Sequence, residues 1–406
     1  MGKVYVINEK GAALIIALLI MAVLSLIGAA ATMTSSMETN IAGNQKASTQ
    51  AFYVAEAGLE RFKAENVDDL DWGDGVILPD ADLGSDGHYT VTIVDPPTPT
   101  VDEITVRSEG TFSGAKKVLQ ACYQRDLKEA FKKCLFADTQ DIYLTTKSGG
   151  KNSPKYIEGD IHSNRDVNGN LKGDHYIDGY VSAVGLITGI SATYLSDEDG
   201  SGNNLGIKPS ADEISFPEID FNKLSTQADE TITPFGGTYL IDGSNTDDWL
   251  TNSSKKIIYI QGDVKISNSS IFDDKIIVAT GDIEVDLWKG HTTNIVNASL
   301  IAQGKIAINE WCGGHSEERG VRGLIYSASS DDDAITVDMK SGGNNVQKKI
   351  EGALMTKGGI DITLKCGGNN SPKKIVYNPD AFDDLIDFFQ DSIYSVKRLY
   401  WREITY

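Results

Sequence analysis

One uninterrupted apolar segment near the N-terminus restricts what this chain can fold into. Residues 12–31 (AALIIALLIMAVLSLIGAAA) carry no charged side chain over twenty positions. As an α-helix the segment is about 30 Å long, which matches the hydrocarbon core of a bilayer. Lys3 and Lys10 precede it, and positive charge favours the cytoplasmic side. The sequence therefore predicts one membrane-spanning helix with the bulk of the chain on the opposite side.

Two other interpretations of this segment are a buried core helix and a cleavable secretory signal. A core helix rarely follows a short charged leader directly, and the usual signal has only 7–15 apolar residues. Small residues at 28–31 do resemble a signal cleavage site. However, 32–64 contain no proline, and a helical stripe from Ile41 to Phe62 follows without a break. The sequence predicts one helix over 12–64, about 80 Å long.

Two motifs in this helix resemble the N-terminal region of PilX-type minor pilins. They are Lys10-Gly11 followed by AALIIALL, and AFYVAEAGLERF at 51–62. The resemblance implies cleavage after Gly11 by a prepilin peptidase and an N-methylated Ala12. It also implies packing of the apolar helix among other pilin subunits. Major pilins carry glutamate at the fifth mature position, where this chain has Ile16, so the resemblance implies a minor subunit.

A small antiparallel sheet is predicted behind the helix, in a pilin-like domain over 65–145. Apolar and polar residues alternate at 88–95, and 104–110 with 111–125 are predicted to form a hairpin whose turn is Ser113-Gly114. In pilin-like proteins such a meander packs on the amphipathic half of the long helix.

The region 146–378 is repetitive. KSGGKNSPKYIEG (147–159) and KSGGNNVQKKIEG (340–352) share nine of thirteen positions, and Gly262, Gly281 and Gly304 recur in similar apolar strings at spacings of 19 and 23. That spacing is typical of the coils of a β-solenoid, here similar to a right-handed parallel β-helix. A β-sandwich remains the alternative. An excursion is predicted at 194–248.

The C-terminal segment 379–406 is expected to cap the repeats. Asp380 is predicted to cap a helix over 381–391, and a closing strand is expected over 394–406. Together they would cover an open β-edge. The whole chain is thus predicted to be α+β and mostly β: leader 1–11, helix 12–64, pilin-like sheet, solenoid-like head, and cap.

Charge and cysteine content limit the possible ligands. The net charge of -21 disfavours nucleic-acid binding. If the bulk is extracytoplasmic, its four cysteines can pair, and the preferred pairs are Cys122 with Cys134 and Cys312 with Cys366. Free thiols, and a zinc site at Cys312 and His315, remain alternatives.

One string resembles a calcium loop. Asp197, Asp199, Ser201 and Asn203 stand at alternating positions, with Gly202 sixth, as in an EF-type loop. The twelfth position is Lys208 instead of glutamate, so a solvated turn is the alternative. If this string binds a cofactor, the pattern predicts calcium.

No catalytic residue is expected. The chain lacks the H-E-x-x-H, G-x-S-x-G and P-loop motifs. Asp160 and His162, close to Arg165-Asp166, could serve a β-helix hydrolase, but they lie in a repeated segment that we interpret as a turn.

These patterns predict a minor pilin-like subunit of a type IV pilus or pseudopilus. We expect insertion in the bacterial inner membrane, processing, and assembly with other pilin subunits at or near the filament tip. The head would serve assembly, adhesion or contact with a surface or polysaccharide. The alternatives are a membrane-anchored or secreted β-helix polysaccharide-active enzyme and a calcium-dependent adhesin on the same anchor.

Overall fold

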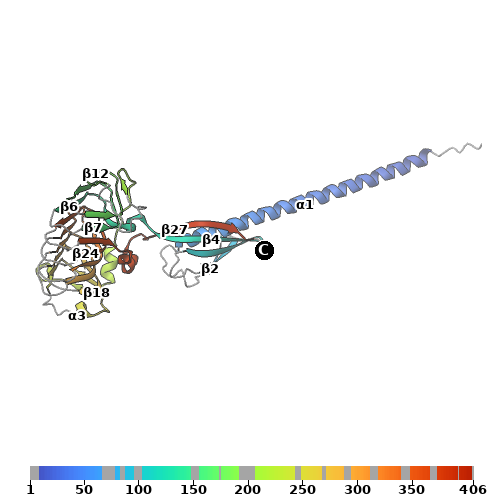
Figure 1. Cartoon of the computed structure of the whole chain (residues 1–406). Helices are drawn as coiled ribbons and strands as arrows, with labels where there is room; N and C mark the ends of the chain where they lie inside the picture. Colours follow the sequence, from blue (N-terminus) through green and yellow to red (C-terminus); the bar gives the residue numbers. More distant parts are fainter. Residues whose placement is uncertain are drawn as a thin grey trace, which may run out of the picture. The chain divides into compact units, whose positions relative to one another are not determined.

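The computed structural model divides the chain into two compact units (Figure 1). We call Met1–Asp126 with Tyr394–Tyr406 the helix–sheet unit, and Leu127–Ile393 the parallel-β unit. The structure describes residues 9–65, 78–82, 87–95, 103–147, 155–172, 175–191, 206–242, 248–267, 271–287, 294–310, 319–339, 348–365, 373–391 and 393–404.

One long helix begins the helix–sheet unit. α1 runs unbroken over Glu9–Glu65, which confirms the predicted continuity from the apolar segment into the amphipathic one. Figure 1 shows α1 extending well beyond the sheet of its own unit. Ala51, Ala55, Leu59 and Phe62 are buried, because these positions share the face that packs on the sheet.

The sheet of this unit has five strands, in the order β1-β2-β3-β4-β27. Their bounds are Leu78–Asp82 (β1), Gly87–Asp95 (β2), Glu103–Phe112 (β3), Ala115–Leu127 (β4) and Tyr394–Glu403 (β27). β1 to β4 form an antiparallel meander. Ser113 and Gly114 make the predicted turn with φ of 45° and 80°, as a two-residue hairpin requires.

The C-terminal strand lies elsewhere than predicted. β27 does not close the repetitive region but pairs with β4: Ile404 donates to the carbonyl of Val118 and Arg402 bonds Gln120. The predicted pilin-like domain over 65–145 is likewise too long, because the unit ends at Asp126 and resumes at Tyr394. The parallel-β unit is therefore an insertion between two neighbouring strands.

The parallel-β unit contains two sheets. The 13-stranded sheet comprises β5 (Lys133–Ala137), β7 (Lys155–Glu158), β8 (Asp160–Ser163), β10 (His175–Asp178), β11 (Tyr180–Ala183), β13 (Gly206–Lys208), β14 (Glu230–Ile232), β16 (Ile257–Ile260), β18 (Ile271–Ala279), β20 (Asn294–Ala302), β22 (Arg319–Ser327), β24 (Lys348–Thr356) and β26 (Lys373–Tyr377). The nine-stranded sheet comprises β6 (Ile142–Lys147), β9 (Val167–Asn170), β12 (Ile187–Thr188), β15 (Thr238–Ile241), β17 (Asp263–Ser267), β19 (Ile283–Leu287), β21 (Ile306–Glu310), β23 (Ile335–Met339) and β25 (Ile360–Lys365).

Short helices complete this unit. They are η1 (Glu129–Lys132), α2 (Phe221–Thr226), α3 (Asp248–Thr251) and η3 (Pro379–Phe388).

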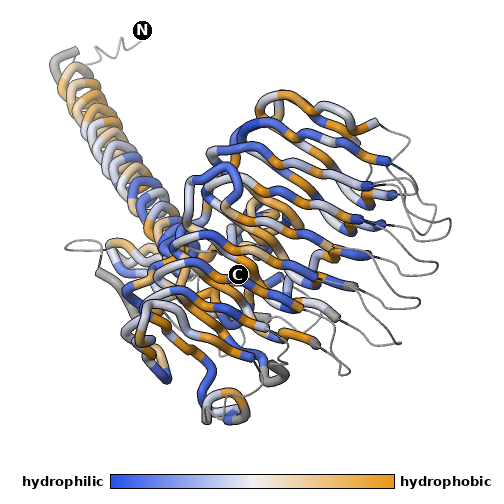
Figure 2. Tube along the Cα trace, turned by 90° about the vertical axis from the view of Figure 1, so that its left-hand side faces the viewer, coloured by the Kyte–Doolittle hydropathy of each residue, from blue (hydrophilic) through white to orange (hydrophobic). Residues whose placement is uncertain are grey.

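The chain alternates between the two sheets, so that each turn of the chain pairs in parallel with the next. Ile257 pairs with Ile276 and Gly323 with Gly352, so one repeat takes 19 to 29 residues. At the predicted corners, Gly281 donates to the carbonyl of Gly262 at 3.0 Å and Gly304 to that of Gly281 at 3.1 Å. Hydrophobic and hydrophilic positions alternate along the strands (Figure 2), which buries one apolar side chain in two between the sheets.

The order of the strands shows that the chain enters this stack in its interior. β5 and β6 are flanked by β8 and β9 on one side and by β24 and β25 on the other. From β5 the chain proceeds to the end formed by β11 to β13, then crosses to the opposite end at β14 and β15. It returns repeat by repeat until β24 and β25 lie beside the first strands. The two ends of the unit also meet, since the Lys128 N–H donates to the carbonyl of Ile393 at 2.9 Å.

The crossing segment, 209–229, covers the outer face of the 13-stranded sheet. Phe216 stacks between Phe136 of β5 and Tyr326 of β22, with ring centroids 6.0 and 5.5 Å apart. The predicted excursion at 194–248 is too wide, because β13, β14 and β15 within it belong to the sheets.

η3 also differs from the prediction. It packs against the outer face at β22 and β24 rather than over an open edge. It is a 3₁₀-helix, and Asn378 rather than Asp380 is its N-cap, accepting a hydrogen bond from the backbone N–H of Asp380 at 3.1 Å.

Candidate functional site

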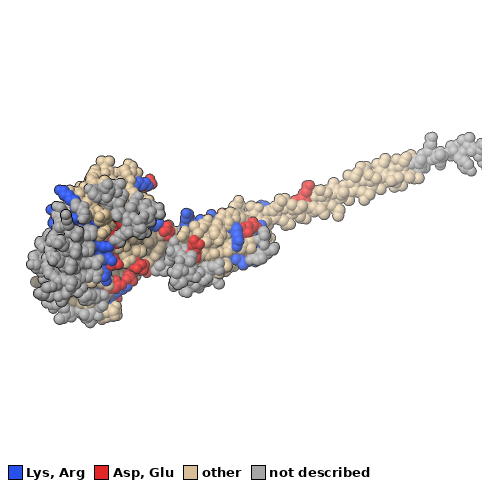
Figure 3. Space-filling view, viewed as in Figure 1, with Lys and Arg blue, Asp and Glu red and all other residues tan. Residues whose placement is uncertain are grey.

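The half of α1 that does not pack on the sheet, its N-terminal half, has an exposed apolar surface. We call it the outer half. Its large aliphatic side chains between Leu14 and Ile27 are 48–71% exposed. Figure 3 shows the visible face of this half without basic side chains and with little acidic surface. By length and composition it is the one helix of the described residues that could cross a membrane. So large an apolar surface requires lipid or other helices around it.

The predicted processing position lies at the start of this helix. Gly11 and Ala12 fall in the first turn of α1, two and three residues after Glu9. The first turn of a helix lacks the backbone hydrogen bonds of the interior, so it unwinds at low cost. The bond after Gly11 is thus in a place that a peptidase can open without unfolding a packed element.

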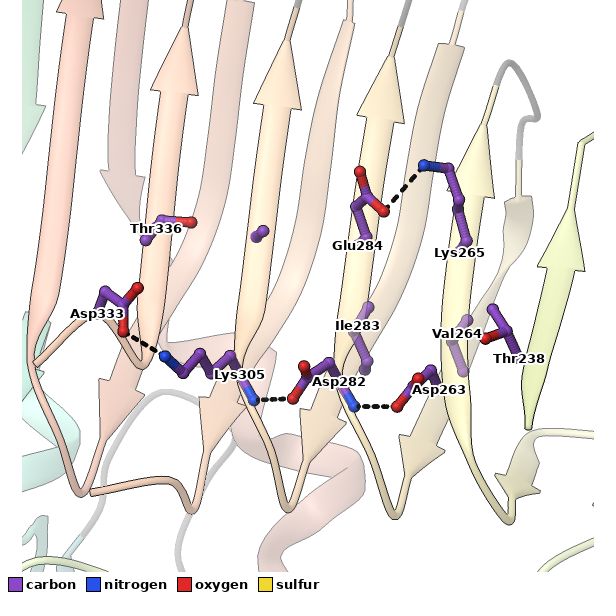
Figure 4. A pocket seen from close by; sticks show the side chains of 11 residues that line it. Thr238, Asp263, Val264, Lys265, Asp282, Ile283, Glu284, Lys305, Asp333 and Thr336 are labelled. Carbon is purple, nitrogen blue, oxygen red and sulfur yellow. Dashed lines mark hydrogen bonds and ion pairs between the residues drawn. The ribbon is translucent and has the colours of Figure 1, made fainter. Parts of the chain in front are cut away.

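A polar hollow lies on the outer face of the nine-stranded sheet (Figure 4). It encloses about 340 Å³. Its lining comes from five neighbouring strands and their preceding corners: Thr238, Asp263, Val264, Lys265, Asp282, Ile283, Glu284, Lys305, Ala307, Asp333 and Thr336. Sequence reasoning missed this hollow, because its residues come together only through the register of the stack.

Aspartates at the corners build one wall of the hollow. Asp263 Oδ1 accepts the backbone N–H of Asp282 at 2.9 Å, and Asp282 Oδ1 accepts that of Lys305 at 2.8 Å. The residue opposite each carboxylate is glycine, and because a Cβ at Gly281 would lie 2.0 Å from Asp263 Oδ1, a larger residue there would displace this carboxylate. The repeated Gly-Asp pair in the sequence therefore fastens one repeat to the next.

The lysines of the hollow are already paired. Lys265 Nζ lies 2.9 Å from Glu284 Oε2 and 3.4 Å from Asp286 Oδ2. Lys305 Nζ lies 2.5 Å from Asp333 Oδ1 and 3.2 Å from Asp331 Oδ2. The hydrogen bond to Lys305 lowers the pKa of the Asp333 carboxyl, so this carboxylate remains charged.

Comparison with protein families finds a match to the PilX N-terminal model over residues 10–60. Over these residues the chain is similar to the PilX N-terminal region. This match contains both the apolar segment and most of the helical face that packs on the sheet. The chain is thus type IV pilin-like at its N-terminus.

Among solved structures, the chain is similar to the competence-associated pilin ComZ from Thermus thermophilus. The identity is 16%, and the alignment covers 88% of this chain and 98% of that one, with a TM-score of 0.27. A TM-score this low does not establish a shared overall arrangement. No curated protein matches the chain significantly.

Outside the PilX-type region, Asp160 and His162 have structural roles. Asp160 bonds Lys133 Nζ at 3.0 Å and accepts the Tyr180 N–H at 2.9 Å. His162 is 1% exposed and bonds Ser182 Oγ at 2.8 Å and Asn164 Oδ1 at 3.0 Å. A substrate cannot reach an imidazole so deeply buried, so the pair does not form a hydrolytic site.

The burial of His162 makes the parallel-β unit sensitive to acid. Burial lowers the pKa of this imidazole, so the unfolded chain takes up the proton more readily than the folded one. The stabilising contribution is therefore present above about pH 6.5 and is lost as the pH falls. We expect the melting temperature of the unit to fall between pH 7 and pH 5, and His162→Gln to reduce that fall.

His88→Gln is the control for this measurement, because His88 is exposed on β2 of the other unit. It should leave the acid sensitivity as in the wild type. An equal fall in His162→Gln and in the wild type would contradict the assignment.

The predicted disulfide between Cys122 and Cys134 is not present. Both cysteines are buried free thiols. Cys122 lies on β4 of the helix–sheet unit, whereas Cys134 lies inside the core of the parallel-β unit. Burial raises the pKa of both thiols. Cys312 and Cys366, and with them His315, lie outside the described residues.

The predicted calcium loop also lies outside the described residues, from Asp197 to Asn203. Lys208, at its twelfth position, is an exposed residue of β13 that pairs with Ser182 of β11. Within the described part of the chain, no three His, Cys, Asp or Glu side chains come together as a metal site.

Proposed function

We propose that this chain is a minor pilin-like subunit of a type IV pilus or related pseudopilus, inserted in the inner membrane and processed after Gly11 by a prepilin peptidase. The observation that carries the proposal is the single helix α1. Its outer half is exposed and apolar, whereas its inner half is packed on a sheet. Such a helix can exchange lipid for neighbouring pilin helices while its own domain stays folded.

A position at or near the filament tip is the second part of the proposal. The parallel-β unit, 127–393, is inserted into a sheet whose other strands form a small domain. So bulky an insertion on every subunit would hinder regular packing in a thin fibre. Ile16, in place of the glutamate of major pilins, also fits a subunit present in few copies.

We infer that the inserted unit is a β-solenoid head of the right-handed parallel β-helix kind. The parallel pairing of successive repeats and the alternation between two sheets support this. The head would be presented for assembly, adhesion or contact with a surface or polysaccharide. We propose no enzymatic activity for it: the only acid–base pair proposed from the sequence is Asp160 and His162, and His162 is inaccessible.

Calcium remains a proposal for Asp197, Asp199, Ser201 and Asn203. If it is correct, calorimetric titration of the purified chain with calcium will give a saturable signal that Asp197→Ala with Asp199→Ala abolishes.

The N-terminus of the mature protein tests the proposed processing. We expect mass spectrometry to find a chain that starts at methylated Ala12. Gly11→Asp should leave more than nine-tenths of the chain unprocessed, because a peptidase that requires glycine has no room for a side chain.

Ala31→Leu is the matched control. It would block a signal peptidase that cuts after small residues but should leave processing at Gly11 intact. The pilin proposal is wrong if the mature chain starts near Thr32 and if Ala31→Leu abolishes this product. That result would indicate a soluble domain secreted after removal of a signal peptide.

A further inference from the structure

The two sheets of the parallel-β unit differ in what their outer faces expose. The outer face of the 13-stranded sheet carries buried apolar side chains such as Tyr326 and Met355, under 209–229 and η3. The outer face of the nine-stranded sheet carries polar side chains that remain partly or fully exposed, among them Lys265, Glu284 and Thr336. The nine-stranded sheet thus offers hydrogen-bonding groups to a partner, with no segment described above as covering them.

The hollow on that face arises from a change in side-chain size. Glu284, Ala307 and Thr336 stand side by side on β19, β21 and β23. Ala307 has only a methyl group between two longer neighbours, so a depression forms above it. Charged groups from the corners border the depression on one side (Figure 4).

The positive charges of the hollow are compensated, and its four lining carboxylates outnumber its two lysines, so the hollow repels anions. Both lysines contact carboxylates, and Asp263 and Asp282 each accept a backbone N–H. An anionic ligand would have to displace a carboxylate from one of the lysines. A neutral ligand rich in hydroxyl groups can donate to carboxylate oxygens and accept from the ammonium groups while the ion pairs persist.

We propose that this hollow binds a neutral saccharide through Lys265, Glu284, Lys305 and Thr336, with the methyl group of Ala307 as its floor. The proposal rests on the proposed function, in which the head is presented for contact with a surface. The volume of the hollow lies in the range of small-ligand sites. The acidic surface of the chain disfavours a nucleic acid in the same place.

The test is binding of the detergent-solubilised full chain to an array of neutral and charged glycans, followed by titration of the best neutral glycan. We expect binding to neutral glycans, and Ala307→Trp should weaken it at least tenfold by filling the hollow. Thr145→Trp is the control: Thr145 also points outward, but from β6, three strands away. It should bind as the wild type does.

If Ala307→Trp does not fold, wild-type protein still decides the question. The bound glycan should slow modification of Lys265 and Lys305 by an amine reagent, but not that of the exposed Lys147. The proposal is overturned if no neutral glycan binds, if charged glycans or DNA bind equally well, or if the lysines are not protected. None of these results alters the mass of the mature N-terminus, so the pilin proposal is tested separately.

Discussion

Gly110→Ala is expected to destabilise the helix–sheet unit by about 3 kcal/mol or more, although it adds one methyl group. Gly110 lies on β3 where α1 crosses the sheet. A Cβ there would lie 2.3 Å from the backbone nitrogen of Ala55 and 2.4 Å from the carbonyl oxygen of Ala51. These are main-chain atoms of a helix, so no side-chain rotation can relieve the clash. Hydrogen exchange of β2, β3 and β4 in the full chain would report the loss.

Gly43→Ala is the matched control for this change. Gly43 lies in the exposed part of α1 with nothing within 4 Å of the added methyl group. Alanine is a better helix former than glycine, so this substitution should stabilise the helix by roughly 0.5–1 kcal/mol. If Gly110→Ala were as well tolerated, the helix could not lie as close to the sheet as described.

Trp249→Ala should cost the parallel-β unit about 3–5 kcal/mol, the usual effect of removing a buried indole. Trp249 of α3 is fully buried and belongs to the core between the sheets. Its ring lies 6.4 Å from that of Tyr239 on β15, the terminal strand of the nine-stranded sheet. The indole thus closes the core at one end of the stack. Thermal unfolding of the full chain would measure the effect.

Trp249→Phe distinguishes the contribution of the apolar volume of the indole from that of its hydrogen bond. It keeps most of the apolar volume but removes the indole N–H, which donates to Tyr239 Oη at 3.4 Å. A bond this long contributes little, so we expect Phe to recover most of the stability. A loss as large as that of alanine would show that the end of the stack depends on the polar contact instead.

The sequence predicted the features that depend on neighbouring residues. The long helix follows from composition and period, the Ser113-Gly114 turn from its residues, and the corners from the spacing of Gly262, Gly281 and Gly304. In each case the contacts that fix the element lie within one turn, one hairpin or one repeat.

Features that depend on distant pairing were not predicted. Lys117 and Glu403 form an ion pair 286 positions apart, and nothing near either residue indicates this partner. The same holds for β24 beside β5, which places the last repeats next to the first. A strand over 394–406 was predicted, and β27 forms over Tyr394–Glu403, but the sequence did not indicate which strand it would pair with.

The candidate sites also divide into one formed by neighbouring residues and one formed by distant residues. Gly11 and Ala12 were predicted from a local motif that resembles a known family. The hollow was missed because Lys265, Ala307 and Thr336 are separated by whole repeats, and only the register makes them neighbours. The pairing of Cys122 with Cys134 was wrong because the two cysteines belong to different units, and the sequence near them does not mark the boundary at Asp126.

Because the chain enters the stack in its interior, the order of synthesis determines when each strand can pair. β5 and β6 emerge first, yet one side of each stays unpaired until β24 and β25 have followed. The sheet to which β27 belongs must also wait for the last residues of the chain. If the chain is exported from its N-terminus, as the proposed function implies, it would therefore expose open strand edges until its last residues have followed. Premature termination anywhere in the insertion should leave both units incomplete.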